Sequence, residues 1–129
     1  MSDCCGGVKL IYACSGAADV GALSDGVARK LAKEGYATKM TCLAGIGAGL
    51  SGYIESAKGA ESNIAIDGCQ IACARIALQN IGVPVKSFIL TDLGYVKGQT
   101  EVTAGVIEAA AEKIRKDEAL QKGKGGCCC

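Results

Sequence analysis

The residues best suited to chemistry in this 129-residue chain are four interior cysteines, each of which follows a stretch that reads as a β-strand. Cys14 follows KLIYA, Cys42 follows YATKMT, and Cys69 and Cys73 follow NIAID through a glycine. If these strands are parallel neighbours, the four thiols converge on one edge of the sheet, where α/β proteins build their sites. Four thiolates are a common ligand set for zinc. The spacing therefore predicts a soft-metal site or a reactive thiol centre.

Two of these cysteines form a local pair in the segment DGCQIAC. Cys69 and Cys73 lie four residues apart in a predicted helix of residues 69–80, so we expect them to share one helix face. Cys69 would lie in the first turn, where the helix dipole and the free amides favour a thiolate. A single cysteine is often no more than a small buried hydrophobic residue. Four cysteines at three converging strand ends favour a functional role.

Composition narrows the chemistry further. The chain has no histidine, which excludes imidazole ligands, Cys–His pairs and serine–histidine triads within it. Nine cysteines in a chain with regular helices and strands point to metal or thiol chemistry rather than to a small disulfide scaffold. Fourteen basic and thirteen acidic residues predict no nucleic-acid or membrane-surface partner. No membrane span or signal peptide is recognisable, so we predict a cytoplasmic protein of undetermined oligomeric state.

Four strand-then-helix units must position the cysteines. The predicted strands are 8–13, 36–42, 63–67 and 85–90, and the predicted helices are 19–34, 50–59, 69–80 and 103–120. This alternation predicts an α/β fold, a Rossmann/flavodoxin-like three-layer sandwich with a four-stranded parallel sheet of order 2-1-3-4 and helices on both faces. In that order the three strands that precede the cysteines are neighbours.

Details of these elements can also be predicted. Asp19 is expected to cap the first helix and Gly35 to end it. The expected buried residues of the third helix are Ile71, Ala74, Ile76 and Leu78. We expect a single metal-binding domain at 8–121, a disordered tail at 1–7, and a flexible tail at 122–129. The tail thiols, Cys4, Cys5, Cys127, Cys128 and Cys129, could deliver or receive a metal ion, or could be inert.

A glycine-rich segment follows the second strand. Gly47 to Gly52 match the dinucleotide fingerprint G-x-G-x-x-G, and Asp67 follows at about the distance of a ribose-binding acid. That fingerprint would start at the second strand of the chain, which argues against a nucleotide. A nest of backbone amides at Gly45–Gly49 that binds a small anionic ligand is the preferred interpretation.

The polar loop TDLGYVKGQT follows the fourth strand. Asp92 and Lys97 could reach the cysteine edge, where their charges would lower a thiol pKa or orient a ligand. Alternatively, the two residues belong to a solvated loop in which the aspartate caps a turn.

Several motifs in order resemble the DGC-domain family of zinc-binding proteins over about residues 8–120. They are Cys14-Ser15-Gly16 with Asp19-Val20-Gly21, the run TCLAGIG from Thr41, Ile66-Asp67-Gly68-Cys69 with Cys73-Ala74, and Thr91-Asp92-Leu93-Gly94 with Lys97. The resemblance implies a bacterial or archaeal source, a zinc site at the four cysteines and no established reaction. Ser15, Asp67, Asp92 and Lys97 would then surround the ligands. One departure from the pattern is Gln70, where a proline is expected.

Two hypotheses about function result. In the first, Cys14, Cys42, Cys69 and Cys73 bind Zn²⁺ or another thiophilic ion, or hold an Fe–S cluster. In the second, the chain is a thiol-based redox enzyme or a sulfur carrier in which Cys69 is the nucleophile and another cysteine resolves it. Sequence leaves open whether a metal site is closed and structural or open and reactive.

Overall fold

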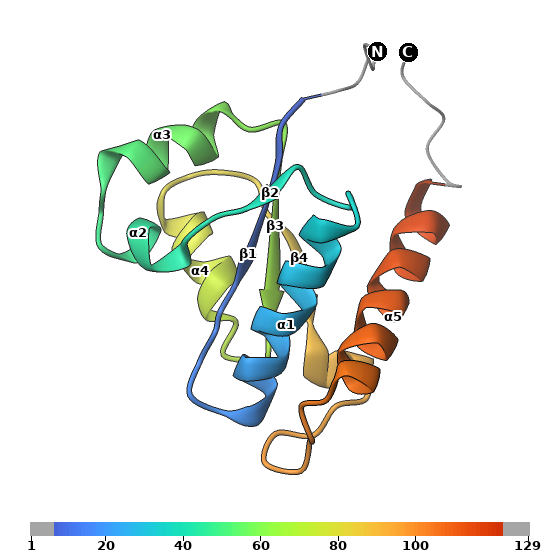
Figure 1. The fold of residues 1–129 in the computed structure, drawn as a ribbon. Coiled ribbons are helices and arrows are strands. Elements are labelled where there is room, and N and C mark those ends of the chain that lie inside the picture. Colours follow the sequence, from blue (N-terminus) through green and yellow to red (C-terminus); the bar gives the residue numbers. More distant parts are fainter. Residues whose placement is uncertain (1–6, 123–129) are drawn as a thin grey trace.

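A four-stranded parallel sheet forms the centre of the protein (Figure 1). The structure is a computed structural model that describes residues 7–122, with side chains described to residue 117. The strands are β1 (Lys9–Ala13), β2 (Lys39–Met40), β3 (Ser62–Asp67) and β4 (Lys86–Ile89). Their order is β2-β1-β3-β4, and all three pairings are parallel. The predicted fold class and strand order are confirmed.

Helices cover both faces of this sheet (Figure 1). They are α1 (Asp19–Lys33), α2 (Leu43–Gly47), α3 (Ser51–Gly59), α4 (Cys73–Asn80) and α5 (Ala104–Lys122), and a short 3-10 helix, η1, spans Leu90–Leu93. α1 and α5 pack on one face, and α2, α3 and α4 pack on the other. Because alternate strand residues point to opposite faces, Ile11 and Ala13 join the first core, whereas Leu10 and Tyr12 join the second.

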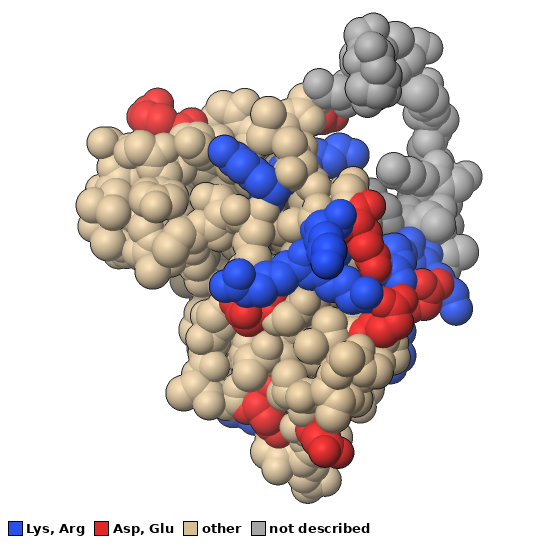
Figure 2. Space-filling model, in the orientation of Figure 1, with Lys and Arg blue, Asp and Glu red and all other residues tan. Residues whose placement is uncertain are grey.

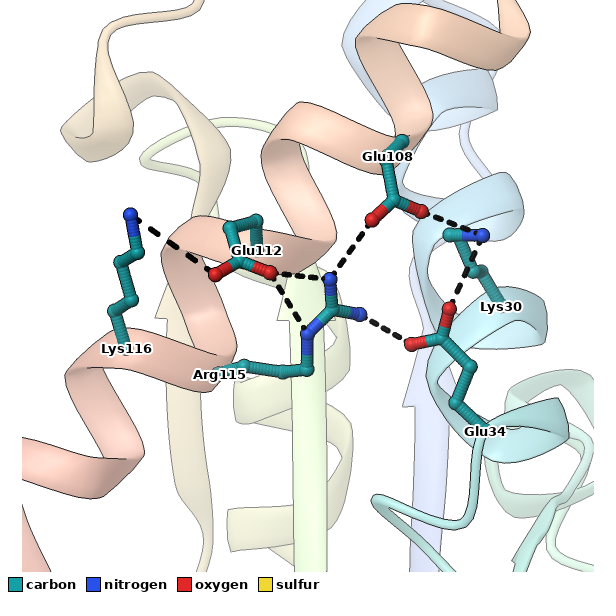
Figure 3. Close-up of polar contacts among 6 residues, drawn as sticks. All are labelled: Lys30, Glu34, Glu108, Glu112, Arg115 and Lys116. Atoms are coloured by element: carbon teal, nitrogen blue, oxygen red, sulfur yellow. Dashed lines mark hydrogen bonds and ion pairs between the residues drawn. The ribbon is translucent and has the colours of Figure 1, made fainter.

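Charged side chains reinforce the packing of α5 on α1 (Figure 3). Arg115 of α5 pairs with Glu34, the C-cap residue of α1, and with two glutamates of its own helix. Lys30 of α1 pairs with Glu34 at 3.1 Å and with Glu108 at 2.6 Å. Solvent screens these groups, so each pair adds little to stability by itself. On this face of the molecule basic and acidic side chains lie intermingled (Figure 2).

The second strand is shorter than predicted. Lys39 and Met40 are in register with β1, and the flanking amides of Thr38 and Thr41 donate to β1 carbonyls at 2.8 and 3.0 Å. The strand starts late because the chain leaves α1 through a turn, in which Gly35 has a φ of +84° and the Tyr36 amide donates to the Leu31 carbonyl. The predicted helix end at Gly35 is confirmed. Asp19, in contrast, is the first residue of α1 and not its N-cap, which is Ala18.

Two buried positions were predicted wrongly. Ile71 is 61% exposed and Ile76 is 44% exposed, whereas Ala74 and Leu78 are buried as expected. Ile71 precedes α4, which starts at Cys73, so it cannot contribute to the buried face of that helix.

The predicted tails lie outside the described residues, apart from Gly7 and from Lys122, which is the last residue of α5. Within the described part of the chain, no helix has the length and apolar character that crossing a membrane requires.

Candidate functional site

Three of the four predicted cysteines line one pocket at the carboxyl edge of the sheet. Cys14 directly follows β1, Cys42 is the N-cap of α2, and Cys73 is the first residue of α4. The pocket has a volume of about 770 Å³, and its wall includes Arg29 and Tyr53. Cys42 and Cys73 are exposed, and Cys14 is half-buried. Three segments far apart in sequence therefore bring thiols to one concave surface.

Cys14 lies among polar groups. Its sulfur accepts a hydrogen bond from the Gly68 amide at 3.4 Å and lies 3.3 Å from the hydroxyl of Ser24. Ser24 is fully buried, accepts from the Ser15 amide at 3.2 Å, and donates its only proton to the Gly21 carbonyl at 2.6 Å. With that proton committed, the thiol of Cys14 is the donor in the Cys14–Ser24 contact. The Gly68 amide and the Ser24 hydroxyl together hold the sulfur of Cys14 in place.

Asp67 determines where α4 starts. Its carboxylate is 1% exposed and accepts hydrogen bonds from the amides of Ala74 at 2.7 Å and Arg75 at 3.1 Å. Burial raises the pKa of this carboxyl, although the two amides act in the opposite direction. Asp67 therefore caps α4 from outside the helix, six residues before Cys73, and fixes Cys73 as the first helical residue. It has no exposed surface with which to bind a ribose.

The predicted pairing of Cys69 with Cys73 on one helix face is wrong. Residues 69–72 form a turn in which the Ala72 amide donates to the Cys69 carbonyl at 3.0 Å, and Ala72 has a left-handed φ of +55°. Cys69 thus precedes α4 and does not line the three-cysteine pocket. Instead, its sulfur lies 3.8 Å from the Nζ of Lys97. Asp92 lies in the same region, where it accepts a hydrogen bond from Gln70.

The side chains as they stand do not form a closed ligand set. Within residues 7–117, no three cysteine, aspartate or glutamate side chains come close enough together to hold a metal ion. The hydroxyl of Ser15 donates to the carboxylate of Asp25 at 3.1 Å rather than to a cysteine sulfur. Ser15 and Ala72 are the non-glycine residues with positive φ in the described chain, and each adjoins a pocket cysteine. Such strained residues cluster at functional sites.

The segment predicted to form an anion-binding loop is a helix in its first half. Residues Leu43–Gly47 form α2, and Gly49 has a φ of +72°. The amides of Ala48, Gly49 and Leu50 donate to carbonyls within the same segment, at 2.8–3.1 Å. The amides of Ala48 and Gly49 are therefore already satisfied within the segment, and an anionic ligand at Gly45–Gly49 stays a prediction.

Sequence reasoning missed the role of Asp19. Its Oδ1 accepts from the Gly98 amide at 2.8 Å, and its Oδ2 accepts from the Thr100 amide at 2.9 Å. These bonds tie the loop before α5 to the start of α1. They also lower the pKa of the Asp19 carboxyl, with the Gly98 bond as the largest cause. Ser24 was missed as well, although a serine among the apolar residues of the predicted first helix was a usable signal.

The lowered pKa of Asp19 gives a pH prediction. Because the folded state favours the carboxylate, the two bonds should persist below the ordinary aspartate pKa of about 3.9 and break only as pH falls through the lower folded value. In an NMR titration, the amide protons of Gly98 and Thr100 should move together with a midpoint below 3.9. The Gly52 amide, which is far from Asp19 in sequence and lies in α3, serves as the control. A shared midpoint above 3.9 would contradict the assignment.

Comparison with known proteins places the chain in a family. The DGC domain matches residues 10–114, which include all four predicted cysteines. The chain belongs to the DGC-domain family. The anaerobic and virulence modulator AnvM of Pseudomonas aeruginosa is 32% identical over 91 residues, which cover 70% of this chain and 69% of AnvM. No solved structure gives a significant match. For this DGC domain, the structure assigns physical roles to the motif residues Asp67 and Gly68, namely capping α4 and packing against α1.

Proposed function

We propose that this DGC domain binds a thiophilic metal ion such as Zn²⁺ through Cys14, Cys42 and Cys73. The observation that carries the proposal is that these three thiols, from three separate loops, line one pocket. Thiolates are the preferred ligands of Zn²⁺ and related soft ions. A bound ion would supply Lewis acidity or a fixed positive charge at this surface.

The donor chemistry of the pocket fits such an ion. Cys14 is the most constrained ligand, since the Gly68 amide and the Ser24 hydroxyl both contact its sulfur. Cys42 and Cys73 are exposed, and their side chains must turn toward Cys14 for the three sulfurs to act together. Groups that orient a ligand sulfur commonly tune metal affinity. The Ser24 hydroxyl and the Gly68 amide are placed to orient the sulfur of Cys14 in this way.

Serine substitution tests the proposal. Each of Cys14→Ser, Cys42→Ser and Cys73→Ser should reduce the zinc bound after dialysis from about one equivalent to less than a tenth, because losing one of three thiolates removes a strong bond to the ion. Elemental analysis of the purified full-length chain supplies the measurement. Cys69→Ser is the matched control and should retain its zinc, because Cys69 lies outside the pocket. Equal loss of zinc in all four variants would contradict the three-cysteine site and support the four-cysteine site expected from sequence.

A second candidate function rests on a different observation. The ammonium of Lys97 lies 3.8 Å from the sulfur of Cys69, where its positive charge can orient the thiol and attract anionic reactants. Cys69 would then act as the nucleophile of a thiol enzyme or as a carrier of sulfur. Alkylation of the metal-free chain separates the candidates: for this function Cys69 must react faster than Cys42, which is more exposed.

A further inference from the structure

We propose that Asp19 is a positioning residue that holds Lys97 against Cys69. Its carboxylate ties residues 96–100, here called the strap, to the first turn of α1. Lys97 belongs to the strap, and its ammonium contacts the Cys69 sulfur. The inference deepens the second candidate function, thiol chemistry at Cys69, and rests on it.

The strap is a small unit with its own internal bonds. The Gln99 amide donates to the Val96 carbonyl at 3.0 Å, and the Thr100 hydroxyl donates to the same carbonyl at 2.7 Å. Gly98 has a φ of +89°, which closes the turn. Fixing the amides of Gly98 and Thr100 therefore also fixes the backbone of Lys97, which lies between them and Val96.

Asp19 supplies most of what joins the strap to the protein. Residues 96–99 are exposed, and Val96 retains 51% of its surface. Among the described residues, the hydrogen bonds from the strap to other segments are the two that end on Asp19 and the contact from Lys97 to Cys69. Without Asp19, little remains to keep the strap in place, and the ammonium can leave the sulfur.

The first turn of α1 supports both members of the contact. Asp19 holds the strap that carries Lys97, and the next residues, Val20 and Gly21, lie directly against Gly68. A Cβ on Gly68 would lie 2.6 Å from the Val20 carbonyl carbon, which shows that the backbone just before Cys69 is in close contact with α1. The first turn of α1 thus positions both residues of the Lys97–Cys69 contact.

A pair of matched reagents can measure this contact. Iodoacetate and iodoacetamide alkylate a thiolate in the same way, with an S–C bond formed and iodide released, but only iodoacetate is anionic. The ratio of their rates at Cys69 reports the positive charge near the sulfur and is insensitive to the fraction of thiolate. Mass spectrometry of the Cys69 peptide from the full-length chain, with a chelator present, gives both rates.

We expect Lys97→Met to lower this ratio roughly two- to fivefold, the effect of a unit charge a few ångströms away in a partly aqueous setting. Asp19→Asn should lower it to a similar extent, and the double variant should show no further loss. Asparagine replaces one acceptor oxygen with an NH₂ group that cannot accept from the strap.

The direction of the Asp19→Asn effect is decisive. Removing a negative charge by itself would raise the preference for iodoacetate, whereas release of Lys97 lowers it. Glu101→Gln is the control, because it removes an equal charge beside the strap and leaves both Asp19 bonds intact; its ratio should stay level or rise slightly.

An Asp19→Asn ratio at or above that of the wild type would overturn the inference. If instead Cys69 reacts no faster than Cys42, thiol function at Cys69 fails, while the ratio still tests the position of Lys97.

Discussion

Replacing Gly68 with alanine should lower the free energy of unfolding by about 3 kcal/mol, the upper part of the range for overpacking. The added Cβ would lie 2.6–2.8 Å from backbone atoms of Val20 and Gly21. Backbone atoms in the first turn of a packed helix cannot rotate away, unlike the end of a flexible side chain. The loop must therefore separate from α1, and the hydrogen bond from the Gly68 amide to Cys14 is lost with it. Urea denaturation followed by circular dichroism measures the change.

The control for Gly68→Ala is Gly52→Ala. A Cβ at Gly52 would meet nothing within 4 Å, and the residue lies inside α3, where alanine is favoured over glycine by roughly 0.5–1 kcal/mol. We therefore expect opposite signs for the two substitutions. If Gly68→Ala were as stable as the wild type, the close contact between this loop and α1 would be wrong.

Replacing Asp67 with alanine should lower the free energy of unfolding by about 2–4 kcal/mol, because the amides of Ala74 and Arg75 lose their acceptor. The first turn of α4 should fray, so Cys73 would lose its position in the pocket. Chemical denaturation measures the stability, and amide hydrogen exchange at Ala74 and Arg75 locates the effect.

Two variants sharpen the Asp67 prediction. Asp67→Asn keeps one acceptor oxygen in the same shape and removes a buried charge, so it should recover at least half of the loss. Glu55→Ala removes an exposed carboxylate from α3 and should change stability by less than about 0.5 kcal/mol. Equal losses in Asp67→Ala and Glu55→Ala would show that Asp67 does not cap α4.

The sheet and its order were predictable because they rest on local signals. Alternating strand and helix patterns dictate parallel strands with crossover helices, and only a few strand orders satisfy the handedness rule. The positions of Cys14 and Cys42 follow directly, since each comes just after a strand whose neighbours are set by that order. Residues 69–72 were harder, because their composition is compatible with a helix that starts at either cysteine.

The candidate metal site itself stays a prediction, but its expected ligands have changed. Sequence spacing alone joined Cys69 to Cys73, on the assumption of one continuous helix from residue 69. The structure separates them, with Cys73 in the pocket beside Cys14 and Cys42, and Cys69 next to Lys97.

By itself, the sequence determined the fold class, the strand order, the family and the edge of the sheet at which the cysteines gather, because repeating patterns and short motifs encode all of these. Only the tertiary structure showed that Cys14, Cys42 and Cys73 line one pocket, whereas Cys69 lies beside Lys97. The start of α4 depends on the carboxylate of Asp67, seven residues before the Ala74 amide that it binds, and on the close contact of Gly68 with α1. The contact of Lys97 with Cys69 likewise depends on Asp19, about 80 residues from the strap. Such contacts exist only after the chain has folded, so no local pattern could have predicted them.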